Sequence, residues 1–323
     1  MARKPTNTKP DRFADPKLTS VDKPMAKFES KGKKSKAQYN QVVVDSGVDT
    51  FQNRLLIGTI TTGDIRMEWA AARYGQSIPA NWSKVDMLQY MSSYIPLRFS
   101  IQDGQNLIVN EVVTKNYEWL ILIEHDTCPP ADGFIRFNEY MRSNKYPLVS
   151  GLYFTKSEPA EPMIYRGRGN SYFTDWVLGD RIGADGVPTG MLLISGKLLK
   201  AVWEDSPEYM AGANRVRRVF DAPIKTFFNE ETGAQEALTG PTDLNFCKRV
   251  IEGGYLEKCG WPELQATQYP FVIDTRISCL QVAGDGTQFP IGGINHWCGT
   301  NSNWPADDIV EQGVIVPELD ELK

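Results

Sequence analysis

The sequence predicts an α/β protein built on a doubly wound, mixed but mainly parallel sheet that is flanked by helices. Two observations predict this fold. Short apolar runs of strand length alternate with stretches of helical spacing, and one run, Trp119–Ile123, is apolar throughout. A strand without polar alternation is typical of a parallel sheet covered on both faces. The chain has 323 residues, 41% of them apolar, which excludes collagen, a coiled coil and a wholly disordered chain.

The first half of the chain supplies alternating elements. The expected order is strand, helix, strand, helix and strand, over residues 54–60, 65–74, 94–101, 105–116 and 119–123. Leu107, Ile108 and Val112 fall on one face of the second helix. Strands joined through helices need crossover connections, so this order predicts parallel pairing.

The second half is less regular. Helices are expected at 133–143, 197–203 and 242–253, and strands at 148–154 and 190–194. Residues 204–240 are polar and contain several glycines, so we expect a long loop that acts as a lid or binding loop. Thr242 or Asp243 can cap the helix that follows.

The charge is divided unevenly along the chain. Residues 1–37 carry eleven basic and four acidic residues, a net charge of +7, whereas the whole chain has a net charge of −5. Residues 1–40 are therefore expected to form a basic, disordered or extended arm. Such an arm is either simply solvated or attracts phosphates, including those of nucleic acid, or an acidic partner. We assign residues 41–300 to one folded domain and 301–323 to a C-terminal tail.

Targeting signals are not evident in the sequence. The longest apolar runs are about five residues, against roughly 20 needed to span a bilayer, and the basic N-terminus has no apolar core of a secretory signal. The five cysteines are scattered without a CxxC pair. Reduced thiols in a cytoplasmic protein are the expectation.

The strongest functional signal follows the apolar strand. Glu124 and Asp126 are separated by one residue directly after Ile123, where ligands bind in open α/β sheets. Two carboxylates there can hold a hard divalent cation whose shell is completed by phosphate oxygens. The alternative is an ordinary solvated acidic pair.

These residues carry a family resemblance. Trp119–Thr127, followed by Pro129 and Pro130, resembles the Asp-x-Asp segment of the GT-A-fold glycosyltransferases, with Glu124 at the first acidic position and Asp126 at the second. The resemblance implies a GT-A (Rossmann-like) catalytic domain, with Asp126 as a ligand of Mn²⁺ or Mg²⁺. Glu124 departs from the family's Asp and is expected to contact the donor's sugar or ribose.

Other segments resemble the family in the same order, over roughly residues 52–300. Residues 55–63 resemble the first strand and loop that seat the nucleotide, and 186–194 resemble the Gly-x-Gly segment near the sugar. Gln105-Asn106 resembles the family's Arg-Asn pair, with Gln in place of Arg. The donor-binding residues that this implies are Thr59, Thr61, Asp64, Gln105, Asn106, Glu124 and Gly190.

Two further residues complete the predicted site. Asp243-Leu-Asn-Phe-Cys247 resembles the family's Glu-Asp-x-x-Phe-Cys helix start, which makes Asp243 the candidate base for the acceptor hydroxyl. A helix N-terminus tends to lower the pKa of an aspartate, and the alternatives are an N-cap or a residue that positions the sugar. By the same resemblance His296 completes the metal shell, unless it is an ordinary surface or core histidine. The side chain of His125 is expected to point away from the two acids, so His125 is either structural or acts only through a neighbouring ligand.

The resemblance implies a metal-dependent glycosyltransferase, transferring a hexose or pentose from a nucleotide-sugar donor to a hydroxyl acceptor. The acceptor would be a glycan, a protein or a hydroxylated DNA base reached through the basic arm. Two alternatives stay open. One is a nucleotidyltransferase that builds a nucleotide-sugar, and the other is a non-catalytic assembly protein that docks through the arm.

Overall fold

The computed structural model describes residues 55–82, 93–167, 173, 175–230 and 233–293. The chain divides into two units, Met1–Val48 and Asp49–Lys323, and every described residue belongs to the second. The predicted arm, His296 and the predicted tail at 301–323 lie outside the described residues. Within the described residues, no helix is both long enough and apolar enough to cross a membrane.

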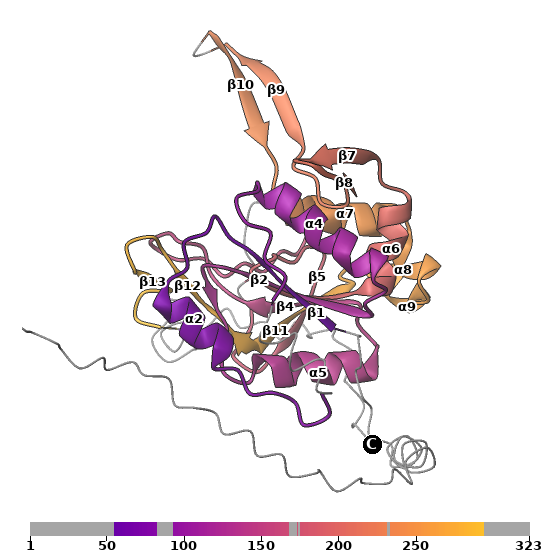
Figure 1. Ribbon diagram of the computed structural model, residues 1–323. Coiled ribbons are helices and arrows are strands. Elements are labelled where there is room, and N and C mark those ends of the chain that lie inside the picture. The colour runs from indigo at the N-terminus through magenta and orange to yellow at the C-terminus, as the bar shows by residue number, and fades with distance from the viewer. Residues whose placement is uncertain (1–54, 83–92, 168–172, 174, 231–232, 294–323) are drawn as a thin grey trace, which may run out of the picture. The chain divides into compact units, whose positions relative to one another are not determined.

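A mixed sheet of six strands forms the centre of this unit (Figure 1). Neighbouring strands follow in the order β1 (Leu55–Ile60), β2 (Trp119–Glu124), β6 (Met191–Ser195), β4 (Leu148–Leu152), β11 (Phe271–Ser278) and β5 (Arg181–Ala184). β1 pairs with β2, and β4 with β11, in parallel. The other neighbours are antiparallel. The predicted mixed sheet is confirmed, but the expectation that it is mainly parallel is wrong. Three of its five strand pairs are antiparallel, because β6 runs against both of its neighbours and β5 runs against β11.

Two layers of helices cover the sheet because its strands are apolar on both faces. Successive side chains of a strand point to opposite faces, so Leu120 and Leu122 of β2 join one core cluster while Ile121 and Ile123 join the other. The first cluster is closed by α4 (Ile101–Thr114), α6 (Gly196–Glu204), α7 (Thr242–Glu252) and α8 (Tyr255–Lys258), and the second by α2 (Met67–Tyr74) and α5 (Gly133–Ser143). A short helix, α9 (Pro262–Gln265), follows α8.

The strand predicted at 94–101 is wrong. Tyr94 and Leu97 make only isolated bridges to β1 and its following loop, and Arg98 has a φ of 63°, which interrupts an extended chain. Ser100 instead starts α4: its hydroxyl accepts a hydrogen bond of 3.1 Å from the backbone N–H of Asp103. The helix thus begins four residues before the predicted position.

The long loop predicted at 204–240 is also wrong, because two hairpins occupy it. The first joins β7 (Glu208–Ala211) to β8 (Asn214–Arg217), and the second joins β9 (Ile224–Asn229) to β10 (Ala234–Thr239). Gly212 and Gly233 lie at the two turns with φ of 60° and 63°, where a side chain would strain the backbone. A separate small sheet joins β3 (Thr127–Cys128), β12 (Leu280–Val282) and β13 (Gln288–Phe289).

Candidate active site

The predicted site lies where the carboxyl ends of β1 and β2 meet the start of β6. The register places Glu124 opposite Ile60 of β1, and the backbone N–H of Glu124 donates to the carbonyl of Gly190 over 2.9 Å. The position of the acidic pair at the end of a buried strand is therefore confirmed. His125 turns toward β1, with Nδ1 3.2 Å from the carbonyl oxygen of Ile60.

Glu124 is a half-buried carboxylate in a negatively charged surrounding. Thr189 Oγ1 donates to its Oε1 over 2.7 Å. Burial, and then the nearby Asp126 carboxylate, raise the pKa of Glu124 to about 7, and Asp243 adds to this rise. The Thr189 hydrogen bond and the Lys156 ammonium oppose it. Asp126, from the same segment, and Asp243, from α7, thus both act on the Glu124 carboxyl group.

Asp126 has one paired and one unpaired oxygen. Lys156 Nζ forms an ion pair with Oδ2, whereas Oδ1 is buried without a hydrogen-bond partner, as is Oγ1 of the next residue, Thr127. The sequence reasoning missed Lys156. It follows the carboxyl end of β4, which runs in the same direction as β2, so the strand order would have placed it at this edge.

These side chains fit a divalent cation with few protein ligands. The Glu124 and Asp126 carboxylates repel one another, and the unpartnered oxygens around Asp126 are the hard donors that Mg²⁺ prefers. Among the described residues, no three His, Cys, Asp or Glu side chains gather closely enough to hold a metal ion. A cation held here would keep water or substrate oxygens in the rest of its shell, as Mg²⁺ commonly does. The metal role of His296 stays a prediction.

Asp243 lies in the first turn of α7, whose N-cap is Pro241 rather than Thr242 or Asp243. Its Oδ1 accepts a hydrogen bond of 2.8 Å from the backbone N–H of Leu244. Burial nevertheless raises the pKa of Asp243, although the N–H groups of Leu244 and Thr189 act to lower it. The expected lowering at a helix N-terminus is therefore outweighed by desolvation.

Thr189 connects the predicted residues and was not itself predicted. Its hydroxyl donates a hydrogen bond to Glu124, and its backbone N–H acts to lower the pKa of Asp243. Gln105 Nε2 lies 3.5 Å from its Oγ1. Gln105 is 1% exposed and its Oε1 has no hydrogen-bond partner. An unpaired buried amide oxygen is rare in proteins, so Gln105 retains an acceptor for a ligand.

Asn106, the neighbour of Gln105, is fully engaged inside the fold. Its Oδ1 accepts from the backbone N–H groups of Val219 and Phe220, and its Nδ2 donates to the Phe220 carbonyl and the Tyr209 hydroxyl. These four bonds use the hydrogen-bonding capacity of the amide. A nucleotide contact through Asn106 would have to break one of them.

Gly190 packs beneath an aromatic ring. Its N–H donates to the Tyr153 hydroxyl over 2.7 Å, and a Cβ at this position would lie 2.5 Å from Cζ of that ring. Glycine is therefore needed for the close approach of β6 to Tyr153.

The three other predicted donor-binding residues lie on β1 and in the loop after it. Thr59 is buried and its hydroxyl has no partner. Thr61 accepts a hydrogen bond of 3.1 Å from the N–H of Gly63, and Asp64 is exposed. All three stay predictions as nucleotide contacts.

Comparison with known proteins gives coarse structural matches only. No family model and no curated protein matches the chain. Solved structures that resemble it include A197 from STIV, with 12% identity and a TM-score of 0.40 over 73% of this chain and 92% of that chain. TarS 1–349 from S. aureus, in complex with UDP-GlcNAc, has 9% identity and a TM-score of 0.31 over 50% of each chain. Likeness at this level assigns the chain to no family and says nothing of its site.

Proposed function

We propose that this chain is a glycosyltransferase that moves a sugar from a nucleotide-sugar donor to a hydroxyl acceptor, with Mn²⁺ or Mg²⁺ as cofactor. The convergence of Glu124, Asp126 and Asp243 at one sheet edge carries the proposal. Glu124 and Asp126 come from one segment and Asp243 from another, and each segment resembles, in sequence, a segment of the GT-A-fold enzymes. Their assembly in one place supports a common function.

The leaving group explains why carboxylates suit this reaction. A nucleotide-sugar leaves as a diphosphate, so negative charge develops on its oxygens, and a bound divalent cation supplies a Lewis acid for that charge. Asp126 would hold the cation. Lys156, paired with Asp126, adds a positive charge at the same place.

Asp243 is the proposed base. Its raised pKa makes it a better proton acceptor than an exposed aspartate, and it would take the proton of the acceptor hydroxyl in an inverting reaction. In a retaining reaction it would instead hold the sugar. Glu124, hydrogen-bonded to Thr189, would accept a hydrogen bond from a donor hydroxyl.

The test is donor hydrolysis by the full chain. Nucleoside diphosphate release would be measured with a panel of nucleotide-sugars and Mn²⁺ or Mg²⁺, for the native chain and for Asp126→Asn and Asp243→Asn. The matched control is Asp205→Asn, at the C-cap of α6. We expect kcat/KM to fall at least about 100-fold for Asp126→Asn and to stay unchanged for Asp205→Asn.

Two outcomes would contradict the proposal. Release of pyrophosphate from a nucleoside triphosphate and a sugar phosphate, without diphosphate release, would show a nucleotidyltransferase. Absence of both turnover and nucleotide binding across the panel would leave the non-catalytic alternative.

A further inference from the structure

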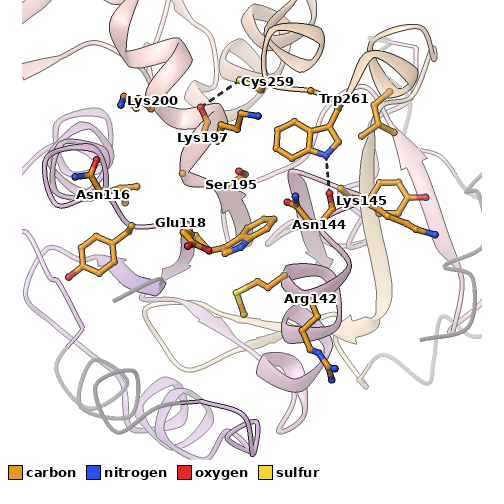
Figure 2. Close-up of a pocket in the computed structure, with 18 of the residues that line it drawn as sticks. Asn116, Glu118, Arg142, Asn144, Lys145, Ser195, Lys197, Lys200, Cys259 and Trp261 are labelled. Carbon is orange, nitrogen blue, oxygen red and sulfur yellow. Dashed lines mark hydrogen bonds between the residues drawn. The ribbon is translucent and has the colours of Figure 1, made fainter. Parts of the chain in front are cut away.

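A second concave site lies at the opposite edge of the same sheet. It is a cavity of about 970 Å³ between α5, α6 and the segment around α9 (Figure 2). Trp119, the first residue of β2, and Ser195, the last of β6, line it. Glu124 ends β2, so the cavity and the candidate active site are separated by the length of the strand, about 17 Å.

The cavity has a surplus of positive charge. Its lining contains four basic side chains and two acidic ones, Arg142, Lys145, Lys197, Lys200, Glu118 and Glu263. Within the described part of the chain, Lys197 and Lys200 form no ion pair with a carboxylate. Unpaired cations around a concave surface favour an anionic ligand.

The N-terminus of α6 opens into this cavity. The first backbone N–H groups of a helix have no intrahelical acceptor, and the N-cap Ser195 makes no side-chain capping hydrogen bond. The N–H of Gly196 donates a hydrogen bond of 2.6 Å to the carbonyl of Glu118. The amides that follow it in the first turn add partial positive charge on the side of Lys197.

Ser195 is an independent sign of a ligand. The residue is 4% exposed and lines the cavity, and its hydroxyl makes no hydrogen bond with any described residue. Figure 2 shows it near the middle of the site, between Lys197 and Asn144. Because the residue is buried and lines the cavity, its hydroxyl keeps a donor for a group that enters the cavity.

The aromatic ring of Trp261 lies beside the ammonium group of Lys197. Trp261 is 9% exposed, and its Nε1 donates to the carbonyl of Asn144 over 3.0 Å, which holds the ring in place (Figure 2). Lys197 Nζ lies 5.7 Å from the centre of this ring. A cation and a flat apolar face side by side suit a molecule that has both an anionic group and a ring.

We infer that this cavity binds a small organic phosphate, with its phosphate at Ser195, Lys197 and Lys200 and its ring against Trp261. Helix N-termini are recurrent phosphate sites, and the volume is within the range of about 300–1,000 Å³ that is typical of small-molecule pockets. A nucleic acid or an acidic protein would contact an extended surface instead. The inference does not rest on the proposed glycosyl transfer.

The test measures binding to the full chain by isothermal titration in the presence of a chelator. The probes are pyrophosphate, uridine diphosphate, adenosine diphosphate and glucose 6-phosphate, each organic phosphate compared with its uncharged counterpart. We expect at least one organic phosphate to bind more tightly than its counterpart. Its affinity should fall at least tenfold, about 1.4 kcal/mol, in the double variant K197Q/K200Q and severalfold in Ser195→Ala.

Matched variants locate the binding. The double variant K248Q/R215Q removes the same charge from two exposed positions outside the cavity, and Asp126→Asn alters the candidate active site; both should bind as the native chain does. Protection of Lys197 and Lys200 from acetylation by the bound ligand, read by mass spectrometry, gives a measurement without substitution.

Each of four results would overturn the inference. These are no preference for any organic phosphate over its counterpart, unchanged affinity in K197Q/K200Q, loss of binding in Asp126→Asn, and displacement by a single-stranded oligonucleotide at an equal phosphate concentration.

Discussion

The chemistry of Glu124 depends on where its strand ends. The same side chain on an exposed loop would titrate near 4.5, whereas burial and Asp126 bring its pKa to about 7. The sequence shows that an acidic pair follows an apolar strand. It does not show that Thr189 lies beside the pair, because Thr189 is 65 positions away in the chain. It comes just before the antiparallel strand β6.

This shift predicts a dependence of stability on pH. In the folded state Glu124 keeps its proton up to about pH 7, but in the unfolded chain only to about 4.5, so the free energy of unfolding falls as the pH rises through this window. Glu124→Gln cannot ionise and should lack the fall. With a chelator present, urea unfolding at pH 5 and pH 8 should show the native chain losing on the order of 1–3 kcal/mol more than the variant. Equal losses of unfolding free energy in the native chain and the variant would contradict a raised pKa of Glu124.

A second residue-scale prediction concerns Gly190. A Cβ there would lie 2.5 Å from the ring of Tyr153 and 2.8 Å from Thr127 Oγ1. Gly190→Ala should therefore lower the free energy of unfolding by about 1–3 kcal/mol, measured by denaturant titration. Gly284→Ala is the matched control, since its Cβ would meet nothing within 4 Å. Similar stabilities for the two variants would show that the site tolerates a side chain.

At the scale of elements, α4 holds the first hairpin in place through Asn106. This side chain bonds both backbone groups of Phe220 and the hydroxyl of Tyr209 on β7. The sequence resemblance had assigned Asn106 to the donor, since the pair Gln105-Asn106 opens a helix in the right order. Which of the two faces the site depends on the rotation of the helix, and α4 starts four residues earlier than its periodicity indicates.

These hydrogen bonds predict that removing the Asn106 side chain has a large effect on the stability of the fold. Asn106→Ala would leave the buried N–H groups of Val219 and Phe220 without an acceptor, and should cost about 2–4 kcal/mol of unfolding free energy. Asn110→Ala is the control: Asn110 lies on the same helix, and its side chain makes no hydrogen bond with the described residues. An Asn106 variant as stable as the control would mean that water replaces the lost bonds.

Elements with strong apolar patterns could be predicted, and exposed ones could not. Residues 133–143 form α5 as the spacing indicates, and Trp119–Ile123 lies in a strand that is buried on both faces. β9 and β10 lack this signal because polar and exposed apolar residues, such as Phe228, alternate irregularly along them. The apolar side chains of Tyr94 and Leu97 are typical of a strand, but the positive φ of Arg98 interrupts the extended chain.

At the scale of the molecule, two sites occupy opposite edges of one sheet. The acidic one gathers Glu124, Asp126 and Asp243, and the basic one gathers Lys197 and Lys200. Both are built from the ends of β2 and β6. The order of strands therefore decides which residues each edge contains, and the sequence alone does not predict this order.

The basic arm is predicted to be dispensable for folding. The buried residues of both large core clusters lie between Leu55 and Phe289, so deletion of residues 1–37 should leave the melting temperature within about 2 °C of the native value. Donor hydrolysis should also be unchanged. Loss of hydrolysis on deletion would place the arm in the catalytic machinery, and an acceptor-dependent loss alone would show that it docks the acceptor.

The most direct test of the proposed function is thermal unfolding of the full chain with nucleotide-sugars, with and without Mn²⁺. At a donor concentration near 100 times Kd, binding should stabilise the folded state by about 2–3 kcal/mol. We predict that at least one donor raises the melting temperature, more so with Mn²⁺. The shift should be lost in Asp126→Asn and kept in K197Q/K200Q. No shift with any donor, or the same shift in Asp126→Asn, would contradict the assignment of the carboxylate cluster as a glycosyltransferase site.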